Sequence, residues 1–243
     1  MHSLIGNYRF DIDAYTTDFR GKATLPLMSS FVLQAATKHA EERNFGYSTM
    51  VEQQKAWVLS RLVIEMFEYP EKDDELNVKT WIAGANKFFT ERCVAFETLD
   101  GKLLGFARTI WAAIDMKTRR PTNVFELQGL TDYIAEQEIP IEGAKKIPQI
   151  KNEESVGKFT VRYSDIDING HLNSMKYIEH FVDMFSMEMF NTKEIRRIEM
   201  NYSNEAHFGT SIRLYKKEEA TDTFILEMKK EDILISSARL YWE

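Results

Sequence analysis

The stretch Ala107-Arg108-Thr109-Ile110-Trp111 returns near the end of the chain as Ala238-Arg239-Leu240-Tyr241-Trp242. Two shorter matches keep the same order: Ile64-Glu65-Met66 returns as Ile198-Glu199-Met200, and Asp18-Phe19-Arg20-Gly21 returns as Asp167-Ile168-Asn169-Gly170. Each match alone is short enough to be chance. Three in one order, with similar spacing between the copies, indicate a duplicated unit whose second copy has shorter connections.

Each copy combines a helix with several strands. In the first copy, Pro26 suits a first helical turn, apolar residues follow at helical spacing, and Gly46 is expected to end the helix. The second copy has an equivalent apolar stripe between Leu172 and Met189. Apolar and polar residues then alternate, which is typical of half-buried strands. The expected strands are 57–69, 75–83, 87–98 and 103–114 in the first copy, and 198–203, 211–217, 222–229 and 233–242 in the second.

The order of these elements predicts the fold class. A long helix followed by several antiparallel strands indicates a helix lying across a curved sheet. We therefore expect an α+β protein with two tandem repeats, the first over residues 1–130 and the second over residues 157–243. Residues 131–156 contain prolines and many charges, and we expect them to form a linker.

Composition and charge exclude several classes of protein. The chain has 243 residues, of which 44% are hydrophobic and 28% charged, and its net charge is −7. This is an ordinary globular profile, and the lack of Lys or Arg runs argues against binding to nucleic acid or anionic lipid. No apolar run approaches the ~20 residues of a membrane span, and no secretory signal is recognised. We expect a cytoplasmic protein without a membrane span.

Most reactive motifs are missing from the sequence. The single cysteine, Cys93, cannot form an internal disulfide or a cysteine metal cluster, and its strand-like surroundings are typical of a small buried residue. No Gly-x-Ser-x-Gly, His-Glu-x-x-His, phosphate-binding loop or dinucleotide fingerprint occurs. The sequence therefore predicts neither a cofactor nor a metal ion.

The richest polar stretch lies between Arg162 and Asn173, just before an apolar helix. It holds the carboxylate of Asp167, the amide of Asn169 and the imidazole of His171. We expect the backbone N–H groups near Gly170 and His171, at the start of the helix, to stabilise a carbonyl oxygen that gains negative charge. The alternative is a capping turn, because Asp and Asn are common before helices.

Comparison of the copies favours a functional interpretation. Asp and Gly recur at the matching turn of the first copy, whereas Arg20 and Lys22 stand in place of Asn169 and His171. Polar residues present in one copy only are better candidates for function than those in both. Glu205, after the strand that begins at Ile198, is a further candidate; its alternative is a solvated turn carboxylate. By sequence, Glu71 of the first copy matches Glu205. Comparison of the two copies therefore does not decide whether Glu205 is a functional residue or a solvated turn carboxylate.

The stretch from Asp167 to Ile178 also resembles a family signature. It closely resembles the Asp-x-Asn-x-His-Val-Asn-Asn-x-Lys-Tyr-Ile pattern of acyl-ACP thioesterases. In the first copy Trp57-Val58-Leu59-Ser60-Arg61, Tyr69-Pro70 and Thr118-Arg119-Arg120 resemble shorter segments of that family. The likeness spans both copies, and it implies a double hotdog fold that hydrolyses the thioester between a fatty acyl chain and acyl carrier protein (ACP).

The resemblance also implies roles for individual residues. Asp167, Asn169, His171 and Glu205 match the catalytic groups of the family. Plant members have a cysteine directly after the glutamate, whereas this chain has Ala206, so water is the expected nucleophile. Either carboxylate can be the general base. Substitution of Asp167 by Asn, or of His171 by Ala, is expected to lower turnover by about 10² or more.

Substrate and partner sites are less specific in the sequence. We expect the first copy to hold the acyl chain, near Met28, Phe31, Val32, Trp57, Leu59 and Leu62, although such a stripe is also typical of a plain core. ACP is acidic, so docking needs a local basic patch. Two clusters qualify, Lys117 with Arg119 and Arg120, and Arg196 with Arg197. An acyl-CoA thioesterase, a non-catalytic acyl-binding module and a homodimer remain open alternatives.

Overall fold

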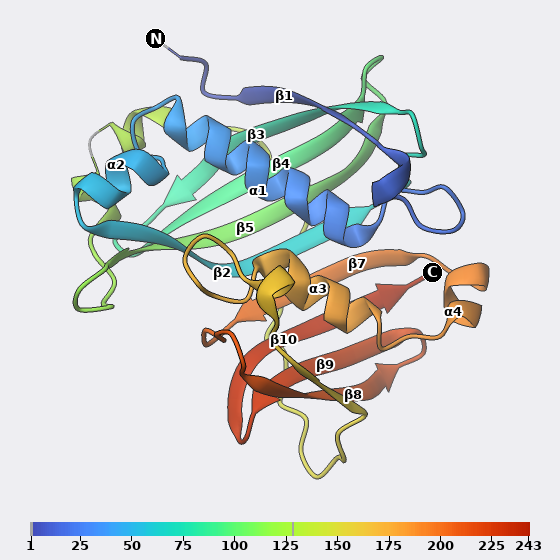
Figure 1. Ribbon diagram of the computed structural model, residues 1–243. Coiled ribbons are helices and arrows are strands. Elements are labelled where there is room, and N and C mark those ends of the chain that lie inside the picture. Colours follow the sequence, from blue (N-terminus) through green and yellow to red (C-terminus); the bar gives the residue numbers. More distant parts are fainter. Residues whose placement is uncertain (1, 128) are drawn as a thin grey trace. The chain divides into compact units, whose positions relative to one another are not determined.

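The computed structural model describes residues 2–127 and 129–243 and divides the chain into two compact units, Met1–Gly143 and Ala144–Glu243. Each unit contains one antiparallel sheet with helices on it (Figure 1). No helix in the described ranges has both the length and the apolar character needed to cross a membrane.

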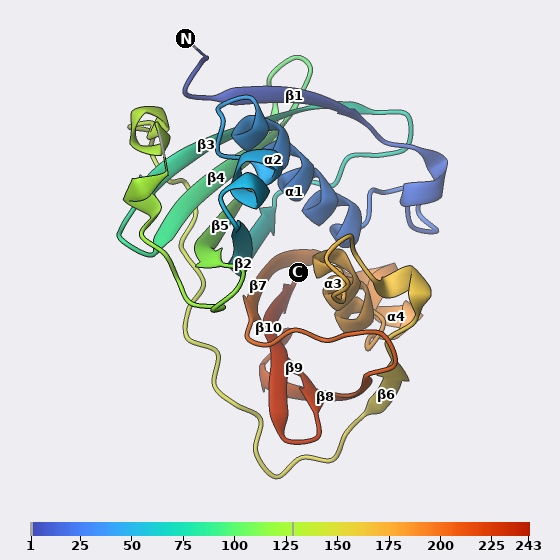
Figure 2. The same ribbon diagram turned by 60° about the vertical axis from the view of Figure 1, so that its left-hand side comes forward.

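Unit 1 arranges its strands in the order β1-β3-β4-β5-β2. Helix α1 (Leu25–Glu41) runs across one face of this sheet and is followed by the short helix α2 (Tyr47–Glu52) (Figure 2). Thr24 caps α1, because its side chain accepts the N–H of Leu27. The strands are β1 (Gly6–Asp11), β2 (Lys55–Met66), β3 (Glu75–Ala85), β4 (Phe89–Thr98) and β5 (Leu103–Asp115).

The expectation that Gly46 ends the first helix was wrong. Helix α1 already ends at Glu41, and Gly46 is the residue that precedes α2. A Cβ added to Gly46 would lie 2.6 Å from the backbone nitrogen of Glu41. The glycine therefore permits a close approach of two backbone segments rather than a left-handed helix end.

Unit 2 repeats the same arrangement. From edge to edge its strands lie in the order β6-β8-β9-β10-β7, which matches β1-β3-β4-β5-β2 of unit 1 element by element. The predicted duplication is thus confirmed, together with the α+β class. The second apolar stripe forms two helices, α3 (Ser174–Val182) and α4 (Met187–Thr192), and the strands are β6 (Gly157–Thr160), β7 (Ile195–Tyr202), β8 (Ser211–Ala220), β9 (Thr223–Lys230) and β10 (Ile233–Trp242).

The segment expected as a linker is divided between the units. Its first half belongs to unit 1, where the short 3₁₀ helix Leu130–Tyr133 is followed by the buried residues Ala135 and Ile141. Its second half belongs to unit 2, where the N–H of Ile150 donates to the carboxylate of Glu227 at 3.0 Å. Each half therefore packs as part of a unit.

Candidate active site

Asp167 organises a tight turn before α3. One carboxylate oxygen, Oδ1, accepts the backbone N–H groups of Asn169 at 2.8 Å and His171 at 3.1 Å. Its backbone carbonyl accepts the N–H of Gly170 at 3.0 Å, and its own N–H donates to the carbonyl of His171 at 2.8 Å. Gly170 has φ +78°, a conformation that favours glycine. Asp167 and Gly170 are therefore required by the shape of the turn.

Unit 1 builds the same turn from Asp18. Its Oδ1 accepts the N–H groups of Arg20 at 2.8 Å and Lys22 at 3.2 Å, and Gly21 has φ +80°. The other carboxylate oxygen pairs with the guanidinium of Arg20. In unit 2 the residue at the place of Arg20 is Asn169, which is exposed and carries no charge. The fold thus needs the Asp and Gly of this turn, but not Asn169 or His171.

The turn changes one expectation about the oxyanion site. The N–H groups of Gly170 and His171 are already hydrogen-bonded to Asp167, so they are not directed at a substrate carbonyl. Helix α3 begins only at Ser174, and the side chain of Asn173 caps it by accepting the N–H of Met175 at 3.0 Å. His171 therefore lies in the loop before the helix, outside its first turn.

Glu205 lies beside His171. Nε2 of His171 and Oε2 of Glu205 are 3.3 Å apart, and both side chains are partly exposed. A hydrogen bond of 2.7 Å from the N–H of Leu172 to the carbonyl of Ala206 joins the two backbone segments next to this pair. The sequence-predicted residues Asp167, His171 and Glu205 are thus brought together, while Asn169 occupies the exposed corner of the same turn.

The structure corrects the sequence match for Glu205. In unit 1 the equivalent backbone hydrogen bond runs from Ala23 to the carbonyl of Pro70, so Pro70 corresponds to Ala206. Glu205 therefore corresponds to the buried Tyr69, and Glu71 corresponds to His207. The expectation that Glu71 matches Glu205 was wrong by two residues. Glu205 is consequently present in one repeat only, like Asn169 and His171.

Two further residues adjoin the site. His207 is exposed, but its ring lies 4.9 Å from that of His171, and its Nδ1 lies 3.3 Å from the carbonyl oxygen of Gly170. Tyr177 of α3 is 4% exposed. Burial, followed by the charges of Glu205 and Asp167, raises the pKa of Tyr177 well above its ordinary value. Tyr177 was visible only as one letter of the signature, because a buried tyrosine on a helix usually belongs to the core.

His171, Glu205 and His207 are also the types of side chain that bind metals. Their ligand atoms lie within 4.8 Å of one another. Two imidazoles and a carboxylate suit zinc, but tetrahedral zinc with bonds of about 2.1 Å keeps its ligand atoms about 3.4 Å apart. These side chains would have to move closer to hold the ion, so the arrangement fits proton transfer better than metal binding.

The residues expected to hold the acyl chain lie in unit 1. Trp57 is half-buried, and its indole N–H donates to the carbonyl of Phe45 at 2.8 Å. The other five are buried, namely Met28, Phe31, Val32, Leu59 and Leu62. They come from α1 and β2, as expected from the helical and strand spacing.

The basic clusters differ in their surroundings. Arg197 pairs with the buried Glu199 at 3.0 Å, and Arg196 pairs with Glu243. Residues 117–120 form an exposed turn after β5, held by the carboxylate of Asp115. This cluster is therefore the more accessible of the two.

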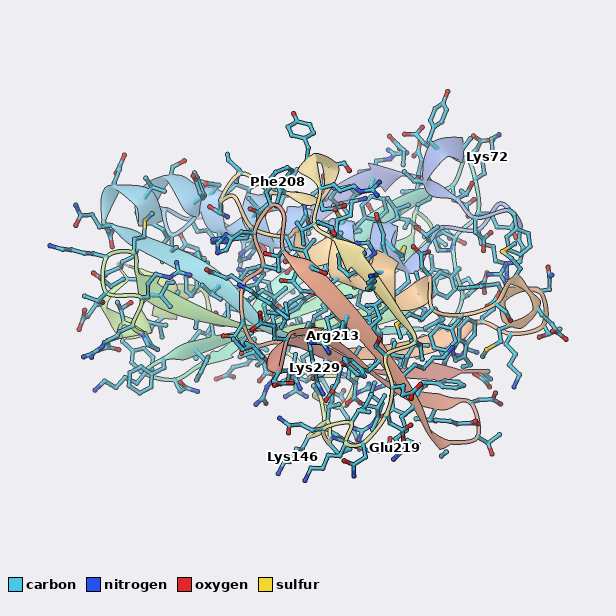
Figure 3. All side chains as sticks on the ribbon, turned by 60° about the horizontal axis from the view of Figure 1, so that its bottom comes forward. Lys72, Lys146, Phe208, Arg213, Glu219 and Lys229 are labelled. Atoms are coloured by element: carbon cyan, nitrogen blue, oxygen red, sulfur yellow. The ribbon has the colours of Figure 1, made fainter. Side chains whose placement is uncertain are left out.

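A basic surface hollow in unit 2 was not foreseen. It has a volume of about 390 Å³ and begins one residue after His207. Arg213 of β8 pairs in register with Lys229 of β9, and the two lie beside each other in Figure 3. No short motif marks the hollow, because its residues come from a loop and two strands: Phe208, Gly209, Thr210, Ser211, Arg213, Lys230 and Glu231.

Comparison with known proteins identifies the family. Residues 6–128 match the acyl-ACP thioesterase N-terminal domain, and residues 149–242 match the acyl-ACP thioesterase C-terminal domain. The structure of an acyl-ACP thioesterase from Bacteroides thetaiotaomicron has 38% sequence identity and a TM-score of 0.93, and the match covers 99% of this chain and 98% of that one. The 12:0-ACP thioesterase from Umbellularia californica, at 18% identity and a TM-score of 0.89, shares the fold over all of this chain and 98% of its own.

Curated plant relatives are more distant. Oleoyl-acyl carrier protein thioesterase 2 of Arabidopsis thaliana is 24% identical over 81% of this chain and 58% of its own length. An acyl-[acyl-carrier-protein] hydrolase of Cuphea viscosissima is 26% identical over 81% of this chain and 50% of its own length. The chain thus spans between half and three fifths of the length of these two relatives. With both domain models matched in order on a double hotdog fold, the chain belongs to the acyl-ACP thioesterase family.

Proposed function

We propose that this protein hydrolyses fatty acyl-ACP thioesters to free fatty acid and ACP. The observation that carries the proposal is the pair of His171 and Glu205, whose reactive side chains are 3.3 Å apart and have no counterpart in the first repeat. A duplicated fold with one polar centre indicates that one copy performs the chemistry. The family and the names of the relatives support ACP as the carrier.

Water is the nucleophile in this mechanism. Glu205 accepts a hydrogen bond from the Nε2–H of His171, which keeps the proton of the neutral imidazole on Nε2. Nδ1 is therefore unprotonated and accepts a proton from the attacking water. The hydroxyl oxygen bonds to the carbonyl carbon, and the C–S bond then breaks. The thiolate leaves and takes the proton back from the imidazolium. Because a thiolate is a good leaving group, this last proton transfer contributes least to the rate.

Asn169 and Asp167 have supporting roles. The amide of Asn169, at the exposed corner of the turn, holds the substrate carbonyl or the water by hydrogen bonds. Asp167 fixes the loop that carries both Asn169 and His171, and its negative charge favours the imidazolium that forms in the reaction. Glu205 is thus assigned as the carboxylate that supports the base, and Asp167 as a positioning residue.

A cysteine nucleophile is excluded at both places where one was considered. Ala206 follows Glu205, so no thiol is present there. Cys93 is 1% exposed and packs in unit 1 with Trp81, Ala95 and Ala135. Burial, followed by the charge of Glu91, raises the pKa of the Cys93 thiol to about 12. The thiolate form needed for attack is therefore scarce at neutral pH.

The decisive experiment compares carriers and chain lengths. Purified protein is assayed with acyl-ACP and acyl-CoA of several lengths, and free acid is quantified. Release of fatty acid with higher kcat/KM for acyl-ACP supports the proposal. A strong preference for CoA would indicate an acyl-CoA thioesterase, and binding without turnover would indicate a non-catalytic acyl-binding module.

A further inference from the structure

A charged side chain interrupts the apolar inner face of the unit 1 sheet. Ile82, Arg92, Thr109 and Leu62 pair in register across β3, β4, β5 and β2, so they form one row. Residues paired directly across antiparallel strands share one face of the sheet. Arg92 is therefore on the same face as Leu62, two strands away, at a Cα separation of about 10 Å. Arg92 also acts electrostatically on His39 of α1, which lies over this face.

Arg92 is buried without a counter-charge. Its side chain is 5% exposed, and one guanidinium nitrogen donates to Oγ1 of Thr80 at 3.2 Å. Within residues 2–127 and 129–243, no carboxylate forms an ion pair with it. After burial, the groups that act most on its pKa are the phenol of Tyr8, which favours the charged form, and the cation Arg43, which disfavours it. Burial lowers the pKa of Arg92 to about 10, which leaves the guanidinium charged at neutral pH.

Arg43, in the same unit, is a buried guanidinium that has both hydrogen-bond acceptors and a counter-charge. It is 4% exposed, and it donates to the carbonyl oxygens of Ser3 and His39 and pairs with Glu42 at 3.0 Å. Thr80 offers Arg92 only one hydroxyl, which itself donates to the carbonyl of Cys93 at 3.0 Å. Buried charges are ordinarily paired, because an unpaired one is destabilising. Arg92 thus lacks a partner that Arg43 has.

We propose that Arg92 binds the carboxylate of a long-chain fatty acyl compound inside unit 1. The location rests on the proposed function together with the expectation from the sequence that the acyl chain lies in unit 1, along Leu62 and the inner face of α1. A carboxylate matches the planar guanidinium with two parallel hydrogen bonds and supplies the missing negative charge. The apolar residues beside Arg92 accommodate the chain.

This carboxylate has two chemical sources. It is either the head group of a free fatty acid, which is the product of the proposed reaction, or a second carboxylate at the far end of the acyl chain of a substrate. Direct binding of dodecanoate by the full-length protein, with 1-dodecanol and acetate as comparisons, tests the first. Kinetics with two acyl thioesters of equal length, one ending in a methyl group and the other in a carboxylate, tests the second.

Dodecanoate is expected to bind at least tenfold more tightly than 1-dodecanol, and acetate is expected not to bind at the same concentration. Arg92→Met, which keeps the length of the side chain but removes the charge, should abolish the preference for carboxylate. Arg43→Met is the matched control, since Arg43 is equally buried but satisfied; it should lower the melting temperature and leave the preference intact.

Equal binding of acid and alcohol to the wild-type protein, together with equal kinetics for the two thioesters, would overturn the proposal even if Arg92→Met fails to fold. Comparable binding of acetate would indicate a small-anion site and also count against it. Binding needs no turnover, so carboxylate selectivity without hydrolysis would refute the proposed function alone. Hydrolysis without selectivity would refute the role of Arg92 alone.

Discussion

At the scale of single residues, the pair of His171 and Glu205 makes the sharpest prediction. His171→Ala removes the proton acceptor, and Glu205→Gln removes the charge that supports it. Each should lower kcat for acyl-ACP by about 10² or more, because general-base catalysis contributes on the order of 10²–10⁴. Glu71→Gln, in the equivalent loop of unit 1, is the control and should retain full activity. Near-normal turnover by a folded His171→Ala protein would contradict the mechanism.

The equivalent turns of Asp18 and Asp167 allow the catalytic role of Asp167 to be separated from its structural role. In Asp167→Asn, the remaining Oδ1 still accepts the N–H groups of Asn169 and His171, so the turn persists without its charge. We expect turnover to fall by about 10² while the melting temperature changes little, since charge stabilisation at an active site is of that order. Asp18→Asn makes the same change in unit 1 and should leave turnover unaffected. Equal activity of both variants would reduce Asp167 to a structural residue.

His39 gives a prediction for pH dependence. Burial, followed by the charges of Arg92 and Arg43, lowers the pKa of His39 to about 3 from its ordinary value of 6.5. Above pH 6.5 the residue is neutral in both the folded and unfolded states. Between pH 6.5 and 3 the unfolded chain binds a proton at His39 that the folded chain does not. The contribution of His39 to the free energy of unfolding therefore falls by about 1.4 kcal/mol for each unit by which the pH is lowered. Above pH 6.5 this residue adds no pH dependence.

The measurement is a series of urea titrations from pH 7 to pH 4. His39→Gln keeps a donor for the carbonyl of Leu4 but cannot titrate, so its free energy of unfolding should fall less steeply than that of the wild type. Parallel curves for wild type and His39→Gln would show that His39 does not titrate as described.

At the scale of elements, α1 and β2 are the proposed walls of the acyl site. Val32 and Leu59 are buried on these elements. Val32→Phe and Leu59→Trp should shift the preferred acyl chain to shorter lengths, because added volume in a packed interior displaces the ligand. Val63→Phe is the matched control, since Val63 is equally buried on β2 but points to the opposite face from Leu62. Chain-length profiles on acyl-ACP decide the outcome, and a loss of stability with unchanged selectivity would contradict the proposed walls.

The helices and strands also show which parts of the fold could be predicted from the sequence. Alternating residues predicted most of the strands to within a few positions, because a half-buried antiparallel strand repeats every two residues. The end of α1 was misplaced because Gly46 serves a close backbone contact with Glu41, which sequence spacing cannot reveal. The match of Glu205 to Glu71 failed because the match of Ile64-Glu65-Met66 to Ile198-Glu199-Met200 is itself two residues out of register. Ile64 pairs with Ala107, whereas Met200 pairs with Ala238, so Ile64 corresponds to Met200. Backbone pairing fixes that register, and a single sequence does not contain it.

Some chemistry was visible in the sequence only in part. Asn169 and His171 could be found because the duplicated chain supplies its own internal comparison. Tyr177 and His207 could not, since their relevance depends on distance to Glu205 and His171 in space. The unpaired charge of Arg92 was equally hidden, because an arginine in a strand pattern is ordinarily exposed.

At the scale of the whole molecule, recognition of an acidic carrier by an acidic protein requires local positive charge. The net charge is −7, so long-range attraction to ACP, the carrier in the proposed function, would have to come from patches that outweigh it nearby. Two patches are accessible: the turn with Arg119 and Arg120, and the hollow with Arg213 and Lys230. The hollow adjoins His207 along the chain, and the exposed ring of Phe208 offers it an apolar contact.

Charge reversal separates the two patches from each other and from catalysis. Arg119→Glu with Arg120→Glu, and Arg213→Glu with Lys230→Glu, are assayed on acyl-ACP and on a small acyl thioester without the carrier. A patch that docks ACP should show a KM for acyl-ACP raised by about tenfold or more on reversal, with the small thioester unaffected, because interfacial charges act chiefly on encounter. The effect should shrink as salt is added, since exposed charges are screened over about 8 Å at physiological ionic strength. Lys72→Glu, an exposed lysine outside both patches (Figure 3), is the control for net charge. If both double reversals slow the two substrates equally, neither patch docks the carrier, and the charges act on folding or on the active site instead.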